Sequence, residues 1–145
     1  MTAEQLFSLA NPAALVGWLI LIAAVITKRD LLRDRLAGFW WPLGLSAAYS
    51  VLIVFFFFKV PGGFDTLANV KLLFTSDWVA LAGWVHYLAF DLLVGSWIAR
   101  EVMQRGQPRL LLVPLLPLTF MFGPAGFLAF HLSQLLLRKT SVSNS

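Results

Sequence analysis

The sequence predicts an all-α fold, an integral membrane four-helix bundle, and two observations carry this prediction. Hydrophobic residues make up 59% of the chain and charged residues only 12%, whereas about 25% of the residues in a typical soluble domain are charged. The apolar residues also gather into four long runs, each near or above the roughly 20 residues that a helix needs to cross the hydrocarbon core. Helices are expected because they satisfy their backbone hydrogen bonds internally in lipid.

The four runs predict a single transmembrane domain over residues 1–137. We expect its spans at about residues 6–27, 39–58, 78–98 and 110–137. The last run is so long that a straight helix would have to tilt or bend, or to emerge from the bilayer. The polar segment 138–145 is expected to form a disordered tail.

The connections between the spans differ in charge and in length. The connections after the first and third spans hold seven Lys and Arg residues, and the opposite side holds four. Cytoplasmic loops carry an excess of positive charge, so we predict that the N and C termini both lie outside the cytoplasm. In the longest connection, the stretch TLANVKLLF at 66–74 predicts a short amphipathic helix on the outer surface.

Two further patterns concern the packing of the spans. ALVGW at 14–18 matches ALAGW at 80–84, which suggests two tandem helical hairpins as a more specific form of the bundle. The stretch GPAG at 123–126 interrupts the fourth span, and such a break needs protein or a cavity around it. We predict that Gly95 of the third span packs against this break, because small residues let helices approach closely.

The third span contains two polar residues near its centre, His86 and Asp91. A central Asp costs about 3 kcal/mol on the insertion scale, which makes it a functional candidate by default. Tyr87 lies four residues before Asp91 and therefore on the same helix face. His131 of the fourth span is expected on the same side of the midplane as His86. We expect Asp91 to line a buried cavity with Tyr87 as its partner and with His86 or His131 nearby.

Simpler roles for these residues stay open. Asp91 can be protonated in lipid and only hydrogen-bond to Tyr87 or to a carbonyl, and each histidine can form an interhelical hydrogen bond. A haem held by the two histidines and a metal held by the histidines and Asp91 are further alternatives. The chain has no Cys, which excludes disulfides, thiolate metal sites and cysteine nucleophiles.

The stretches HYLAFDLLVGSWIARE (86–101) and LLLVPLLPLTFMFGPAGFLAF (110–130) resemble the ABA4-like family. Its plant members are plastid membrane proteins needed to make neoxanthin from violaxanthin in the pathway to abscisic acid. No transit peptide is recognised, so we expect a bacterial member in the bacterial inner (plasma) membrane. The resemblance is carried by His86, Tyr87, Phe90, Asp91, Gly95, Trp97, Gly123, Pro124 and Gly126.

The resemblance implies a neoxanthin-synthase-type protein, a membrane carotenoid-modifying isomerase that acts by acid and base chemistry on an apolar polyene. Conversion of an epoxycarotenoid to an allene requires a base for a vinylic proton and an acid for the opening epoxide oxygen, without a redox cofactor. The catalytic candidates Asp91, His86, His131 and Tyr87 include group types suited to this work. The residues expected to bind the substrate are Trp84, Phe90, Gly95, Phe120, Phe122, Gly123 and Pro124.

Other functions stay open. The first alternative is a non-catalytic carotenoid- or pigment-binding subunit of a membrane assembly, and the others are a haem or metal membrane protein and a small transporter. No cofactor or metal is predicted, and a carotenoid is expected as substrate or bound ligand. The expected partners are the lipid bilayer, a carotenoid or other apolar lipid, and a second copy or a membrane complex. Nucleic acid is not expected, because the basic residues lie at the ends of apolar runs.

Overall fold

The computed structural model describes residues 1–143, with side chains to residue 137. Its elements in chain order are α1 (Ala3–Thr27), η1 (Leu32–Trp40), α2 (Trp41–Phe56), η2 (Phe57–Lys59), α3 (Leu67–Leu73), α4 (Asp77–Gln104), η3 (Arg109–Leu111) and α5 (Leu112–Ser143). Four segments are helical, long and apolar enough to cross a membrane. The predicted all-α fold with four such helices is therefore confirmed.

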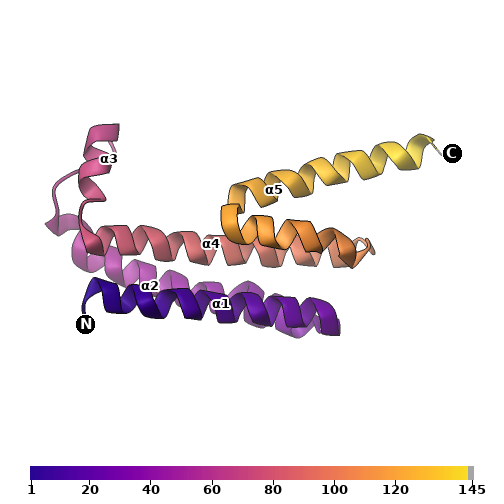
Figure 1. Ribbon diagram of the computed structural model, residues 1–145, viewed down its shortest axis with the longest axis horizontal. Coiled ribbons are helices and arrows are strands. Elements are labelled where there is room, and N and C mark those ends of the chain that lie inside the picture. Colours follow the sequence, from indigo (N-terminus) through magenta and orange to yellow (C-terminus); the bar gives the residue numbers. More distant parts are fainter. Residues whose placement is uncertain (144–145) are drawn as a thin grey trace.

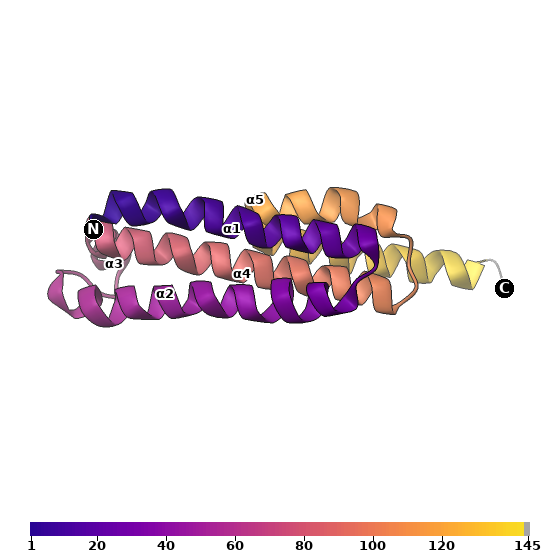
Figure 2. The ribbon, with the colours of Figure 1, turned by 90° about the horizontal axis from the view of Figure 1, so that it is seen from below.

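The central helix of the bundle is α4. Figure 2 shows α4 running between α1 and α2, with α5 on a third side, and α4 makes contacts with all three helices. In its most apolar stretch 56% of the residues are buried, against 33% in α1 and 11% in the η1–α2 segment. Polar side chains on α4 are therefore shielded from lipid by neighbouring helices to a degree that those on the other helices are not.

Local sequence signals explain where α1 and α3 begin. Thr2 and Gln5 form a capping box, with hydrogen bonds of 2.9 and 3.2 Å between each side chain and the other residue's backbone N–H. The Thr66 hydroxyl accepts a hydrogen bond of 3.2 Å from the Asn69 backbone N–H and caps α3. The short helix predicted at 66–74 is thus present.

The connection after α1 is shorter than expected. Only a few residues separate α1 from η1, a π-helix that continues directly into α2. The segment predicted as a basic loop is therefore mostly helical. The reason is burial, because Arg33 and Ala37 on this segment face the inside of the bundle, and the hydrogen bonds of a helix satisfy its backbone there.

The most important departure from expectation is a bend in α5. Phe122 has non-helical backbone angles, φ −147° and ψ 65°, and the chain turns back at this point (Figure 1). The Gln107 Nε2 atom donates a 2.6 Å hydrogen bond to Gln134 Oε1. A straight helix would carry Gln134 about 30 Å away from Leu112, at 1.5 Å per residue. The helix therefore consists of two arms that form a hairpin.

The residues around the bend explain why the two arms can lie close together. Pro124 lacks a backbone N–H and disfavours helical angles in the residue before it. A Cβ atom on Gly126 would lie 2.0 Å from Thr119 Oγ1 on the other arm, so only glycine fits this approach. The predicted break of the fourth span is present, and it reverses the direction of the chain.

The bend bears on three expectations about the second half of the chain. The segment 110–137 enters the bundle to about its middle and turns back at Phe122, so it is not one straight helix. The two ends of the described chain consequently lie at opposite ends of the bundle and not on the same side (Figures 1 and 2). The α4–α5 unit also differs from the α1–α2 hairpin, because α5 is interrupted at Phe122. Of the tail expected to be disordered, residues 138–143 are helical and residues 144–145 lie outside the described residues.

Candidate functional site

The Asp91 carboxyl lies in the middle of α4, directly opposite the bend of α5. Its residue is only 5% exposed. A Cβ atom on Gly123 would lie 1.9 Å from Asp91 Oδ1, so the backbone of the bend and the carboxyl are in close contact. The absence of a side chain at Gly123 is therefore what allows α5 to bend over Asp91.

Tyr87 connects the same carboxyl to the end of the first arm. Its hydroxyl donates a hydrogen bond to the Met121 carbonyl, one of the backbone groups at the helix break. The hydroxyl also interacts with the Asp91 carboxyl one helical turn away. Tyr87 and Asp91 thus both lie at the break of α5, and Tyr87 satisfies a carbonyl of the bend.

One oxygen of the Asp91 carboxyl is left without a partner. The Oδ2 atom is buried and makes no hydrogen bond to any residue that the structure describes. A buried polar atom without a partner is costly and calls for a specific explanation, such as a catalytic role or an unseen bound group. The arrangement offers a proton acceptor or donor next to a phenol, inside a helix bundle.

The two histidines do not join this group. The exposed His86 ring faces α2, where it lies 5.2 Å from the Tyr49 ring centroid. The exposed His131 ring lies on the second arm of α5, 5.8 Å from the Trp97 ring centroid. Residues 86 and 97 are about 16 Å apart along α4. The expectation that a histidine accompanies Asp91 is therefore corrected, because the His86 ring lies against Tyr49 of α2 and the His131 ring lies against Trp97, much farther along α4.

The separation also bears on the alternatives that required both histidines. Neither a haem held by two imidazoles nor a metal held by both histidines and Asp91 fits positions so far apart. Among the residues that the structure describes, no group of three or more His, Asp or Glu side chains is close enough to hold a metal ion.

The residues expected to bind substrate fall into three places. Trp84 stacks on Tyr87 at a centroid distance of 5.6 Å and donates a 2.7 Å hydrogen bond to Asn11 of α1. Phe90 stacks on His86, at 4.6 Å. Four further candidates lie at or near the bend of α5: Phe120, Phe122, Gly123 and Pro124. Gly95 lies elsewhere.

Gly95 contacts α1 and not the bend. A Cβ atom on Gly95 would lie 2.4 Å from the Trp18 ring, and the Trp18 ring meets Phe120 edge-on, with centroids 5.4 Å apart. The predicted contact of Gly95 with the break of α5 is therefore wrong, and the small residue instead makes room for an indole. Trp18 in turn fills the space between α4 and the first arm of α5.

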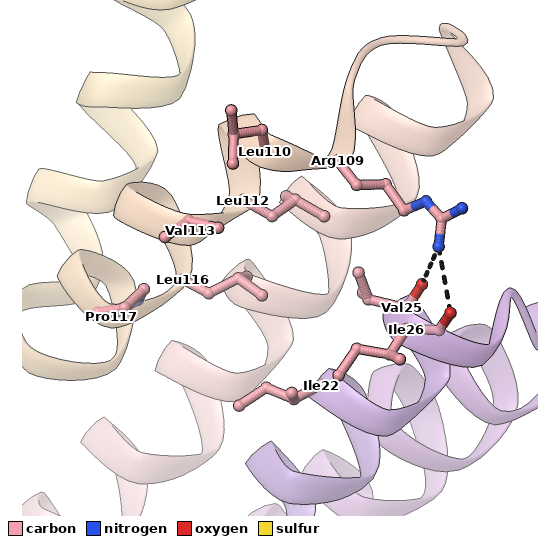
Figure 3. Close-up of a pocket in the computed structure, with 9 residues that line it drawn as sticks. All are labelled: Ile22, Val25, Ile26, Arg109, Leu110, Leu112, Val113, Leu116 and Pro117. Carbon is pink, nitrogen blue, oxygen red and sulfur yellow. Dashed lines mark hydrogen bonds between the residues drawn. The ribbon is translucent and has the colours of Figure 1, made fainter.

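Sequence reasoning missed an apolar groove between α1 and the first arm of α5. Its larger part is a cavity of about 480 Å³ lined by Ile22, Val25, Ile26, Arg109, Leu110, Leu112, Val113, Leu116 and Pro117 (Figure 3). A smaller cavity of about 180 Å³ shares three of these residues and ends at Trp18 and Phe120. Trp18 covers Gly95, one turn beyond Asp91, so the inner end of the groove lies near the buried carboxyl, although Asp91 itself lines neither cavity.

Arg109 closes the far end of this groove. Its Nη1 atom donates hydrogen bonds to the Val25 carbonyl (2.9 Å) and the Ile26 carbonyl (3.2 Å), as Figure 3 shows. These carbonyls belong to the last turn of α1, which lacks intrahelical partners. The arginine thereby ties the start of α5 to the end of α1 and keeps the two walls of the groove together.

These features define a class of protein: a small polytopic membrane protein with a buried carboxyl beside a partly exposed phenol at a helix break. A family model described as ABA4-like (ABA DEFICIENT 4-like) matches residues 5–130. The chain belongs to this family, and its predicted membership is confirmed. Comparisons with curated proteins and with solved structures found no match.

Proposed function

We propose that the protein is a neoxanthin-synthase-type isomerase that acts on an epoxycarotenoid in the membrane. The observation that carries the proposal is the buried Asp91 Oδ2 atom, which has no partner among the described residues and lies beside Tyr87 at the break of α5. A membership in the ABA4-like family and an apolar groove leading toward this point support the same function.

The reaction is an isomerisation, so its atoms balance without a co-reactant. The Asp91 carboxylate removes a vinylic proton of the polyene next to the epoxide ring. The electron pair of that C–H bond shifts to form the allene, the epoxide C–O bond breaks, and the oxygen takes a proton from the Tyr87 hydroxyl. The proton then passes from Asp91 to the Tyr87 oxygen, which restores both groups.

The groove between α1 and α5 supplies a route for such a substrate. It extends from the bundle end at Arg109 toward the middle of α4, a depth of about half the 30 Å hydrocarbon core. Its walls are almost wholly apolar, so they favour a long hydrocarbon and not a polar solute. Trp18 and Phe120 form the inner end, and movement of these rings would open the groove to Asp91.

The test replaces the carboxyl by its amide. Asp91→Asn keeps the shape of the side chain and removes the group that exchanges a proton, and Asp77→Asn, at the exposed start of α4, is the matched control. Each variant is produced in bacterial cells that make violaxanthin, and the pigments are separated by chromatography. We expect Asp91→Asn to lose conversion by at least about 100-fold, the usual minimum for a lost acid–base group, and Asp77→Asn to convert normally.

A wild-type rate for Asp91→Asn would refute the catalytic role, provided that immunoblots show equal amounts of protein in the membrane. The alternative function, a carotenoid-binding subunit without activity, predicts a different outcome. In that case the purified wild-type protein carries a carotenoid, the pigments of the host stay unchanged, and Asp91→Asn has no effect.

We also propose an orientation that takes the bend of α5 into account. Because the second arm returns to the end at which α5 began, that end of the bundle holds nine of the 11 Lys and Arg residues, and the other end holds Lys59 and Lys71. The positive-inside rule then assigns the basic end to the cytoplasm. The N-terminus lies outside and the end of α5 inside, and the bacterial inner membrane is the proposed location.

A further inference from the structure

A second cavity lies at the basic end of the bundle, separate from the apolar groove. It has a volume of about 360 Å³ and lies between η1, α4 and the second arm of α5. The residues of its wall that matter here are Arg33, Asp34, Gly38, Ser96, Trp97, Arg100 and Phe127. Ser96 follows Asp91 by five residues, which places it about 140° around α4, so the cavity faces away from the Asp91 carboxyl.

Two polar groups of this cavity lack partners. The Ser96 residue is 4% exposed, and its Oγ atom makes no hydrogen bond within the described part of the chain. Arg100, one turn further along the same face of α4, forms no ion pair or hydrogen bond with the residues described. A positive charge and a buried hydroxyl, neither with a partner among the described residues, therefore lie side by side at one cavity.

The cavity wall also contains an acidic residue, Asp34, which is paired with Arg33. Arg33 is 3% exposed and forms ion pairs of 2.7 Å with Asp30 and 2.8 Å with Asp34. Glu101 pairs with Arg105 at 2.6 Å. Asp30 is not part of the cavity wall, so the charged residues of the wall are Arg33, Asp34 and Arg100. Together they leave one net positive charge, on Arg100, and this charge favours an anion.

The π-helical form of η1 shapes one wall. A Cβ atom on Gly38 would lie 3.3 Å from the Ser96 Cβ and 2.9 Å from the Arg33 carbonyl, so the backbone of η1 approaches α4 closely at this glycine. Short π-helical segments are frequent at functional sites, and here the segment also carries the buried Arg33. This wall of the cavity therefore lies directly against Ser96.

The depth of the cavity indicates which anion it meets. Arg100 lies about 13 Å along α4 from Asp91, which is at the middle of the helix, and the hydrocarbon core extends about 15 Å from its midplane. Arg100 is thus at the level of the lipid phosphates, and Trp97 and Phe127 offer apolar contacts below it. We propose that this cavity binds one anionic phospholipid, with Arg100 and Ser96 donating hydrogen bonds to the phosphate oxygens and with the first methylenes of an acyl chain against Trp97 and Phe127.

The test measures lipid binding to the delipidated protein in detergent by native mass spectrometry. Dioleoylphosphatidylglycerol and dioleoylphosphatidylcholine are compared on the wild type, Arg100→Gln, Arg100→Lys, Ser96→Ala and Arg35→Gln. Arg35 is the matched control, because it is an exposed arginine of η1 outside the cavity. A basic residue near the surface is worth about 1 kcal/mol toward anionic lipid, which corresponds to about a fivefold change in affinity.

We expect the wild type to bind one phosphatidylglycerol at least about fivefold more tightly than phosphatidylcholine. Arg100→Gln should lose this preference, Arg100→Lys should keep most of it, and Ser96→Ala should weaken binding without a change in charge. Equal binding of the two lipids by the wild type, or equal losses in Arg100→Gln and Arg35→Gln, would overturn the proposal. Displacement of the lipid by an excess of inorganic phosphate would assign the site to a free anion and refute the lipid assignment. If Arg100→Gln fails to fold, unchanged binding in Ser96→Ala counts against the site.

Discussion

The contact between Gly123 and Asp91 makes a quantitative prediction about Gly123→Ala. The three heavy atoms nearest to a Cβ at this position all belong to Asp91: Oδ1 at 1.9 Å, Cγ at 2.8 Å and Oδ2 at 3.6 Å. The new methyl group must push the buried carboxyl aside or open the bend of α5. Overpacking of this kind costs about 1–3 kcal/mol, equivalent to about 5- to 150-fold in the unfolding equilibrium.

A double-mutant cycle isolates the contact. Asp91→Ala removes all three atoms, so Gly123→Ala should cost nothing in that background and can stabilise the helix by up to about 1 kcal/mol. The coupling free energy between the two positions should therefore be about 1–3 kcal/mol. The free energy of unfolding is measured by SDS titration in mixed micelles, with fluorescence of the tryptophans as the signal.

Gly44→Ala serves as the control for the loss of a helical glycine. A Cβ atom on Gly44 meets no described atom within 4 Å, so this variant should be neutral or slightly stabilising. If Gly123→Ala were equally destabilising with and without the Asp91 carboxyl, the bend would not rest on Asp91, and the account of the site would have to be abandoned.

Three further predictions follow from other parts of the bundle. Because the second arm of α5 turns back, a reporter fused to the C-terminus should be located in the cytoplasm, and a reporter fused to the N-terminus should be located outside it. The same location for both reporters would contradict the hairpin. Gly95→Ala places a Cβ 2.4 Å from Trp18 and should destabilise the protein by about 1–3 kcal/mol. In the same SDS titration, the additional substitution Trp18→Leu should relieve most of this loss. An undiminished loss would refute the Gly95–Trp18 contact. The Asn69 amide donates hydrogen bonds to the Asp65 carboxylate at 2.9 and 3.1 Å and lowers the pKa of Asp65 below its usual value. Because this pKa is lowered in the folded state, the contact stabilises the loop at pH values above the unfolded-state pKa, and the stabilisation is lost as the pH falls through the folded-state pKa. Asn69→Ala should therefore raise the pKa of Asp65 in an NMR titration. An unchanged pKa would exclude the hydrogen bond as the cause of the lowered value.

The sequence alone determined the features that depend on neighbours along the chain. Length and hydropathy predicted the four apolar helices, because a segment that spans lipid must pair its backbone N–H and C=O groups internally, and a helix does this within one segment. The spacing of four residues predicted that Tyr87 and Asp91 share a face, and the stretch 66–74 predicted the short helix α3. Each of these is local: the helical repeat fixes it whatever the rest of the molecule does.

Only the tertiary structure decided what the polar and small residues face. The stretch 123–126 predicted a break in α5, but a Gly-Pro break permits many directions of the chain after it. The contacts of Gly123 with Asp91 and of Gly126 with Thr119 select the direction that turns the chain back. From the sequence, Gly95 could have packed against another helix or against an aromatic ring. In the structure, the Trp18 ring of α1 packs against it. The histidines separate and the Ser96–Arg100 cavity forms for the same reason: which neighbour covers a helix face is set by the packing of whole helices, and helical periodicity does not encode it.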